Sequence, residues 1–202
     1  MERRARQSQL GSVPTEREKM LRGELYVAAD PALVAARERA RRLWQSYNVL
    51  DPAAADARRD VLKELLGGIG KSSVIEPPFF CDYGTQITLG AEVFVNFNCV
   101  FLDCNTIDIG AQTQLGPAVQ LYTATHPLDA AARTAGPELA YPIRIGSRVW
   151  IGGGAILLPG VEIGDDTVVG AGSVVTKSLP SGVLAAGNPC RVIRTVHDGS
   201  GH

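Results

Sequence analysis

The sequence predicts a mainly β protein, a solenoid of short strands preceded by a helical N-terminal segment. Three observations support this prediction. Apolar residues recur at a spacing of six from residue 89 onward, glycine directly follows many of them, and the first 70 residues instead show helical spacing. A period of six fits neither an α-helix nor the alternation of an ordinary strand. It fits a solenoid in which three hexads form one coil of about 18 residues.

Composition and charge are those of an ordinary globular chain. The 202 residues are 45% hydrophobic and 20% charged, which is sufficient for a buried core. Without an apolar stretch typical of a signal peptide or a membrane span, we expect a cytoplasmic protein. The four cysteines show no C-x-x-C spacing and are expected to be free thiols. The basic run RERARR lacks interleaved aromatic residues, so no nucleic-acid partner is expected.

Three helices are expected in the N-terminal segment. Thr15 and Glu18 have the spacing of a capping box. A second helix is predicted to start at Pro31, because proline suits a first helical turn. A third is predicted to begin at Asp51 and to end at Gly67. Three short helices cannot bury their apolar stripes by themselves, so they should pack on the segment that follows.

The repeat itself is made of two lattices of apolar residues that should point inward and form the core. The first consists of Ile109, Leu115, Leu121, Ile145, Ile151, Leu157, Ile163, Val169 and Val175, and the second of Leu89, Val95, Phe101 and Ile107. The first lattice stops at residue 121 and resumes at 145 in register. We therefore expect residues 122–144 to form a loop extruded from one coil, and loops of this length are commonly functional.

The chain resembles the hexapeptide-repeat acyltransferases in the segments IGSRVW, IGGGAI, VEIGDD, VVGAGSVVTK and AAGNPCRVIR. It is similar to the maltose and galactoside O-acetyltransferases, the maltose type above all, in GELY, EPPFFCDYG, VNFNCVFLD, YTATHPLD and VWIGGGAILLPGVEIG. The resemblance covers about residues 14–196. It implies a left-handed parallel β-helix, whose hand the period alone does not determine. The implied organisation is a helical maltose-acetyltransferase-type segment, 14–70, and a β-helix acetyltransferase domain, 71–196, with the extruded loop 122–144.

The resemblance also implies a reaction, direct transfer of an acetyl group from acetyl-CoA to a hydroxyl of a sugar such as maltose, glucose or a galactoside. His126 lies at the base of the extruded loop and is expected to act as the general base. Asn96 matches the family's asparagine and is expected to stabilise the oxyanion. An imidazole that only hydrogen-bonds the loop and an amide that only caps a strand are the simpler alternatives.

The resemblance also implies which residues of this chain bind the two substrates. The acceptor positions are Asp82, Phe94, Asn96, Asp103 and Glu138, with Asp30 and Arg37 as weaker matches. Phe94 and Glu138 differ from the residues of the galactoside enzymes, and both differences favour a glucose-type acceptor. The alternative for any one of these acidic residues is a solvated position at a corner of the solenoid. The positions for acetyl-CoA are Trp150, Gly153, Ala171, Thr176, Lys177, Arg191 and Arg194, of which the basic ones suit phosphates. Gly153 replaces the serine of some relatives.

Several rival functions share the solenoid. A γ-type carbonic anhydrase needs three histidine ligands for zinc, whereas only His126 lies outside the last six residues, so no metal is expected. Serine or antibiotic acetyltransferases, and an idle scaffold or binding solenoid, stay open as alternatives.

The resemblance implies a homotrimer with each active site between two subunits. The extruded loop carries apolar residues, among them Leu128 and Tyr141, that a monomer would expose. A loop that reached the adjacent subunit would bring Glu138 or Asp82 of one chain beside His126 of another.

Overall fold

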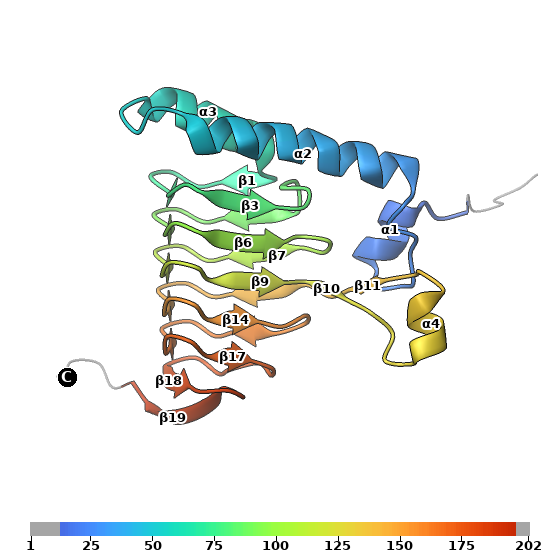
Figure 1. The fold of residues 1–202 in the computed structure, drawn as a ribbon. Helices are drawn as coiled ribbons and strands as arrows, with labels where there is room; N and C mark the ends of the chain where they lie inside the picture. Colours follow the sequence, from blue (N-terminus) through green and yellow to red (C-terminus); the bar gives the residue numbers. More distant parts are fainter. Residues whose placement is uncertain (1–12, 197–202) are drawn as a thin grey trace, which may run out of the picture.

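Short parallel strands stack into three flat sheets around one core in the computed structural model of the chain (Figure 1). The structure describes residues 13–196. Each successive coil adds one strand to each sheet, and the coils wind left-handed (Figure 1). The mainly β, parallel β-helix predicted from the six-residue period is therefore confirmed.

Up to residue 175, the chain visits the three sheets in the order I, II, III. Sheet I contains β1 (Gly68–Ile69), β4 (Ile87–Leu89), β7 (Ile107–Ile109), β12 (Ile143–Ile145) and β15 (Glu162–Ile163). Sheet II contains β2 (Val74–Ile75), β5 (Phe94–Val95), β8 (Gln114–Leu115), β13 (Trp150–Ile151), β16 (Val168–Val169), β18 (Val183–Ala186) and β19 (Arg191–Thr195). Sheet III contains β3 (Phe79–Cys81), β6 (Cys99–Leu102), β9 (Gln120–Tyr122), β14 (Ile156–Leu157) and β17 (Val174–Val175). Strand β19 is antiparallel to β18 and ends the stack.

Both lattices of apolar residues form the core of the β-helix. Every residue of the two lattices is buried and belongs to a single hydrophobic cluster. Successive side chains of a strand point to opposite faces. In β4, Ile87 and Leu89 accordingly point inward and Thr88 points outward. Inward residues of one coil therefore rest on those of the next.

Glycine at the corner between sheets I and II allows adjacent coils to approach closely. A Cβ atom added to Gly110 would lie 2.5 Å from the carbonyl carbon of Gly146 and 2.6 Å from the nitrogen of Ser147. Both atoms are backbone, so the clash cannot be relieved by moving a side chain. The recurring glycine of the sequence is thus a consequence of coil stacking.

We expect Gly110→Ala to lower the free energy of unfolding by about 3 kcal/mol, because the added methyl group forces two coils apart. Gly68→Ala is the matched control, since the nearest atom to its new Cβ is the Thr88 methyl carbon at 3.3 Å. Urea unfolding of both variants checks this. Equal losses of stability in the two variants would contradict the stacking explanation.

The N-terminal helices follow most of their sequence signals. They are α1 (Glu16–Leu21), α2 (Pro31–Val49) and α3 (Ala55–Leu65). The capping box of Thr15 and Glu18 is present, and Pro31 is the first residue of α2. The predicted start of α3 at Asp51 is wrong. The Asp51 carboxylate accepts a hydrogen bond from the N–H of Ala53 at 2.8 Å and so forms a turn before the helix.

Helices α2 and α3 lie across the first coil and cover its open edge (Figure 1). Arg59 donates hydrogen bonds to the carbonyl groups of Gly70, 2.8 Å, and Ser73, 3.0 Å. Asn48 exchanges two hydrogen bonds of 2.9 Å with the backbone of Phe79. Side chains therefore form hydrogen bonds with backbone groups of this edge, and the covered edge cannot pair with another strand. Strand β1 begins at Gly68, slightly before residue 71, where the β-helix was expected to begin.

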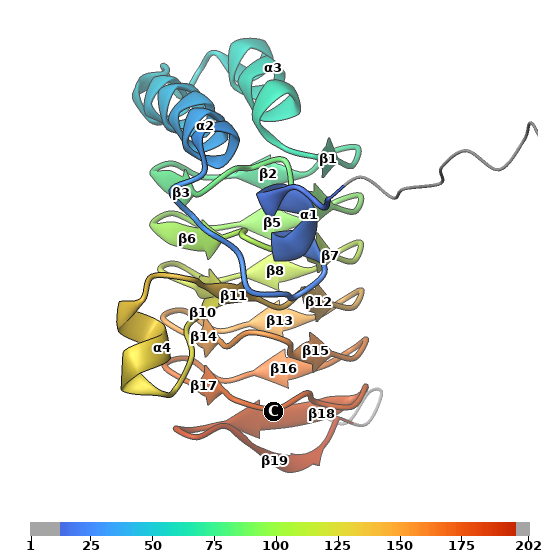
Figure 2. The same cartoon turned by 90° about the vertical axis from the view of Figure 1, so that its right-hand side faces the viewer.

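The excursion, residues 123–142, leaves the corner between sheets III and I after β9 and returns at β12. It contains β10 (Ala124–Thr125), α4 (Ala130–Thr134) and β11 (Leu139–Ala140), and β10 pairs with β11. Figure 2 shows α1 and α4 flanking this pair on the same side of the β-helix. The buried Asn105 side chain donates to the carbonyl groups of Met20, 3.1 Å, and Ala140, 2.9 Å, so it joins α1 and β11 to the coil. No helix in the part of the chain that the structure describes is long and apolar enough to cross a membrane.

Candidate active site

The structure divides the predicted site residues between two separate edges of the β-helix. The corner between sheets III and I, here the histidine edge, carries Asp82, His126, Glu138, Thr176 and Lys177. Sheet II and the corner between sheets II and III, here the asparagine edge, carry Phe94, Asn96, Trp150, Gly153 and Ala171. Arg191 and Arg194 lie on β19, at the end of sheet II.

The two edges lie at opposite ends of the sheet III strands. Strands β6 and β9 are parallel neighbours, with Leu102 opposite Tyr122. Asn96 comes before β6, whereas His126 comes after β9. A strand rises about 3.3 Å per residue, so the four steps from Asn98 to Leu102 alone cover roughly 13 Å. Asn96 and His126 of one chain therefore cannot both contact the same reacting carbonyl group.

Asp82, Glu138 and His126 share one edge of a single chain, because Asp82 follows β3 and Glu138 lies in the excursion. The pairing of Asp82 or Glu138 of one chain with His126 of another stays a prediction.

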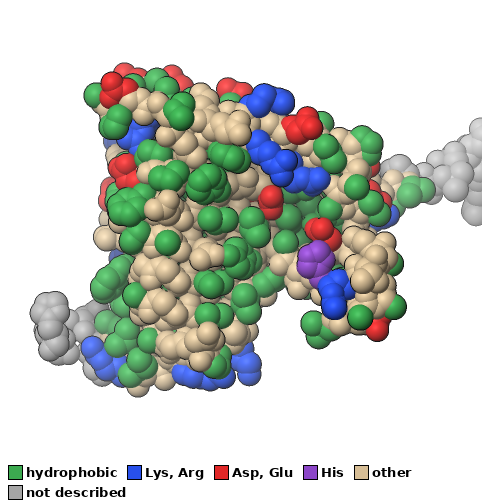
Figure 3. All heavy atoms as spheres, in the orientation of Figure 1, with side chains coloured by type: hydrophobic (Ala, Val, Ile, Leu, Met, Phe, Trp, Pro, Cys, Tyr) green, Lys and Arg blue, Asp and Glu red, His purple; other side chains and the backbone are tan. Residues whose placement is uncertain are grey.

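His126 is exposed at the start of the excursion, directly after β10. No hydrogen bond joins its ring to another residue among those described, which leaves both ring nitrogens available. Figure 3 shows the imidazole, in purple, with an acidic and a basic side chain beside it on this face. Arg133 of α4 donates to the carbonyl groups of Pro127, 3.1 Å, and Leu128, 3.0 Å, and so fixes the backbone after the histidine.

Asp82 and Glu138 form the acidic part of the histidine edge. Asp82 is half-buried, and its carboxylate accepts a weak hydrogen bond from the Cys104 thiol at 3.5 Å. Burial raises the pKa of Asp82, against the opposing effects of this hydrogen bond and of Arg37 and Arg41. Glu138 accepts a hydrogen bond of 3.0 Å from the Tyr26 hydroxyl, and the backbones of these two residues also pair.

Asp103 does not lie on the surface of this site, contrary to the expectation that it binds the acceptor. Its side chain is wholly buried. One carboxylate oxygen accepts from the N–H groups of Asp82, 3.0 Å, and Tyr83, 2.8 Å, and the other accepts from Gln86, 3.3 Å. Asp103 therefore shapes the turn that presents Asp82. The sequence did not reveal this role, since a buried and an exposed aspartate look alike after a strand.

Because of its burial, Asp103 should make the fold more stable in mild acid than in base. Burial raises its pKa from 3.8 to about 7, although the backbone N–H groups oppose this. The unfolded chain then loses this proton first, so the contribution of Asp103 falls as pH rises above about 4 and levels off above 7. We expect urea unfolding to give higher stability at pH 5 than at pH 8, and Asp103→Asn to reduce that difference. An unchanged difference in the variant would contradict the assignment.

Asn96 retains the donors that an oxyanion requires. Its side-chain oxygen accepts from the N–H of Phe97 at 2.8 Å, and its amide nitrogen has no hydrogen-bond partner in residues 13–196. The two weaker acceptor candidates serve local structure instead. Asp30 caps α2 by accepting from the N–H of Ala32 at 3.0 Å, and Arg37 donates to the Tyr83 hydroxyl at 2.6 Å.

The cofactor candidates on the asparagine edge form an accessible surface. Trp150 is 58% exposed on sheet II, and Ala171 is exposed at the adjoining corner. Lys177 is exposed on the other edge of the chain. Arg191 and Arg194 are exposed on β19. A cofactor contacting all of these residues must therefore span two edges.

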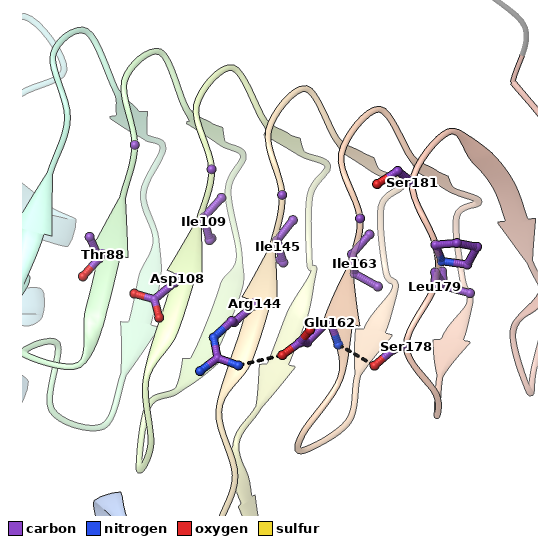
Figure 4. Close-up of a pocket in the computed structure, with 15 residues that line it drawn as sticks. Thr88, Asp108, Ile109, Arg144, Ile145, Glu162, Ile163, Ser178, Leu179 and Ser181 are labelled. Atoms are coloured by element: carbon purple, nitrogen blue, oxygen red, sulfur yellow. Dashed lines mark hydrogen bonds and ion pairs between the residues drawn. The ribbon is translucent and has the colours of Figure 1, made fainter.

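A hollow of about 670 Å³ lies elsewhere, along sheet I and its corner with sheet II (Figure 4). Outward side chains of successive coils form a ladder along it, in which Arg144 pairs with Glu162 at 2.6 Å. None of the predicted site residues lines this hollow. It is therefore separate from the candidate active site.

The part of the chain that the structure describes offers no set of side-chain ligands for a metal ion. Within residues 13–196, no group of three or more histidine, cysteine, aspartate or glutamate side chains is arranged to hold a metal ion. The four cysteines are buried free thiols.

Comparison with known families identifies both parts of the chain. Residues 19–70 match the family described as "Maltose acetyltransferase hexapeptide capping motif". Residues 142–177 match the family described as "Bacterial transferase hexapeptide (six repeats)".

Relatives match nearly the whole chain. The structure of a maltose O-acetyltransferase from Clostridium difficile 630 is 46% identical with a TM-score of 0.90, covering 92% of this chain and 99% of that one. The structure of a galactoside acetyltransferase in complex with coenzyme A is 36% identical with a TM-score of 0.89, covering 92% and 93%. Nodulation protein L of Rhizobium meliloti is 52% identical over 178 residues, covering 88% of this chain and 97% of its own length.

Proposed function

The chain belongs to the hexapeptide-repeat acetyltransferases related to the maltose and galactoside O-acetyltransferases, and from this premise we propose that it transfers the acetyl group of acetyl-CoA to a sugar hydroxyl. The observation that carries the proposal is the exposed His126 imidazole on the same edge as two partly protected carboxylates, Asp82 and Glu138. This combination suits a hydroxyl nucleophile held by acids and deprotonated by a base.

His126 is the proposed general base. A sugar hydroxyl is too weak an acid to attack a thioester unaided, so the neutral imidazole removes its proton as the oxygen attacks the acetyl carbon. A tetrahedral intermediate forms, and its collapse breaks the carbon–sulfur bond. The proton on the imidazolium then passes to the departing coenzyme A sulfur, which returns the histidine to its neutral form.

Asn96 is the proposed oxyanion donor, and its free amide group supports that role. Since Asn96 and His126 lie at opposite ends of the sheet III strands, we propose that each site combines the histidine edge of one subunit with the asparagine edge of another. The exposed apolar surface of the excursion, where Leu128 is 96% exposed and Tyr141 39%, supports burial in an oligomer. A homotrimer closes such a head-to-tail contact into a ring.

The proposed acceptor is a glucose-type sugar held by Asp82 and Glu138, with Phe94 on the asparagine edge as an apolar contact. A carboxylate accepts hydrogen bonds from two neighbouring hydroxyls, which a sugar offers and a simple alcohol does not. Asp103 has no part in this proposal. We propose a cytoplasmic location, which is supported by the four free thiols.

Measurement of coenzyme A thiol release tests the function directly. With acetyl-CoA present, we expect release with glucosides or maltose, and none with serine or with amine antibiotics. Thiol release with an amino acid or an antibiotic, and with no sugar, would show that the acceptor is another small molecule. A protein that binds acetyl-CoA yet releases no thiol with any acceptor would support an idle binding solenoid.

The proposed cofactor surface gives a further prediction. Lys177→Ala, Arg191→Ala and Arg194→Ala should each raise the KM for acetyl-CoA a few-fold, because each removes a cation suited to phosphate. The loss should shrink at high salt, since exposed charge pairs are screened. Arg144→Ala, on the separate hollow of sheet I, is the control. An unchanged acetyl-CoA KM in all three variants would argue against this surface.

A further inference from the structure

Tyr26 and Cys104 each hold one of the two acceptor carboxylates from the protein interior. The Tyr26 hydroxyl donates to one oxygen of Glu138 at 3.0 Å. The Cys104 thiol donates to one oxygen of Asp82 at 3.5 Å. The four residues come from separate segments of the sequence, and Tyr26 and Cys104 belong to the same buried cluster.

Both side chains are shielded from water. Tyr26 is 1% exposed and Cys104 is 6% exposed, and they belong to one apolar cluster with Met20 and Leu33. A hydroxyl or thiol in such surroundings has no water to bond with, so it is held to the partners that the protein supplies. The geometry of both contacts is therefore fixed by packing of the N-terminal segment against the corner.

Each carboxylate uses only one oxygen in its contact with Tyr26 or Cys104. The second oxygen of Asp82 and the second oxygen of Glu138 have no hydrogen-bond partner among the residues that the structure describes. A carboxylate anchored through one oxygen keeps its orientation, and its other oxygen can accept a hydroxyl without first reorganising.

We propose that Tyr26 and Cys104 are positioning residues that set the orientation and spacing of the Asp82 and Glu138 carboxylates. The N-terminal segment is then part of the acceptor site, although Tyr26 and Cys104 themselves need not contact the sugar. This inference rests on the proposed function, in which those two carboxylates hold the acceptor.

Kinetics with three variants tests the proposal. Cys104→Ala and Tyr26→Phe should each raise the KM for the acceptor up to about tenfold, as expected for loss of one hydrogen bond to a charged group. The kcat and the KM for acetyl-CoA should stay within about twofold of the wild type. Cys104→Ser retains a donor and should restore most of the acceptor affinity.

Two other buried side chains provide matched controls. The hydroxyl of Tyr47, a residue of α2, donates a hydrogen bond to the Ile75 carbonyl. The Cys99 thiol donates to the Gly116 carbonyl at 3.4 Å. Tyr47→Phe and Cys99→Ala should leave the acceptor KM unchanged. If Cys104→Ala and Cys104→Ser behaved alike, or if acceptor and acetyl-CoA KM rose together, the role would be structural and the proposal overturned.

A spectroscopic measurement tests the contact to Asp82 independently of acetyl transfer. In protein labelled with ¹³C at the aspartate carboxyl carbon, Cys104→Ala should shift the Asp82 resonance, identified through Asp82→Asn, because it removes the thiol donor at 3.5 Å. An unmoved Asp82 resonance would overturn the positioning role of Cys104. If the wild type acetylates no sugar while the resonance does move, the proposed function fails and the positioning contact stands.

Discussion

Replacing His126 by alanine is expected to lower turnover by roughly 10² to 10⁴, the usual contribution of a general base. The fold should be unaffected, because the side chain is exposed and forms no hydrogen bond with the described residues. Binding of acetyl-CoA should also persist, since the proposed cofactor residues are other side chains. Steady-state thiol release, together with the acetyl-CoA dissociation constant of the variant, provides the measurement.

The decisive contrast is between turnover and binding. Arg144→Ala serves as a surface control, because Arg144 lies on sheet I beside Glu162 and away from the histidine edge. It should retain wild-type turnover. A His126→Ala protein with near-normal turnover would exclude the histidine as base and favour an imidazole that only completes the loop.

Mixing two inactive variants should restore activity if each site is shared between subunits. His126→Ala lacks the base and Asn96→Ala lacks the oxyanion donor, but in a mixed trimer some sites combine the intact His126 of one chain with the intact Asn96 of its neighbour. Random assembly from equal amounts makes about one site in four intact, so about a quarter of wild-type activity should return. Sedimentation of the mixture should give three chains of 21.5 kDa each, about 65 kDa together.

A second mixture controls for nonspecific recovery. Asp82 and His126 lie on the same edge of one chain, so mixing His126→Ala with Asp82→Ala should leave every site defective. Recovery in the first mixture alone supports the shared site. Recovery in the second but not the first would instead mean that the excursion reaches across to the neighbour's Asp82. A trimer without recovery in either mixture would place each site within one chain, and a fully active monomer would remove the shared site altogether.

The sequence by itself determined the β-helix, because its core repeats at fixed spacing. Each inward residue, such as Ile109 or Ile145, meets its equivalent one coil away, so the pattern appears along the chain as a period. The excursion was evident for the same reason, since the period resumes in register after it. The capping box of Thr15 was also predictable, because an N-cap depends on neighbours three residues away.

Only the tertiary structure decided how the candidate site is assembled. Asp103 and Asp82 both follow sheet III strands, yet one is buried under backbone N–H groups and the other borders the site. Tyr26 lies far from Glu138 in the sequence, and no local pattern predicts their hydrogen bond. The separation of Asn96 from His126 follows from strand direction in sheet III. Hydrogen bonds and burial at these positions depend on segments that only folding brings together, whereas periodicity and capping are properties of neighbouring residues.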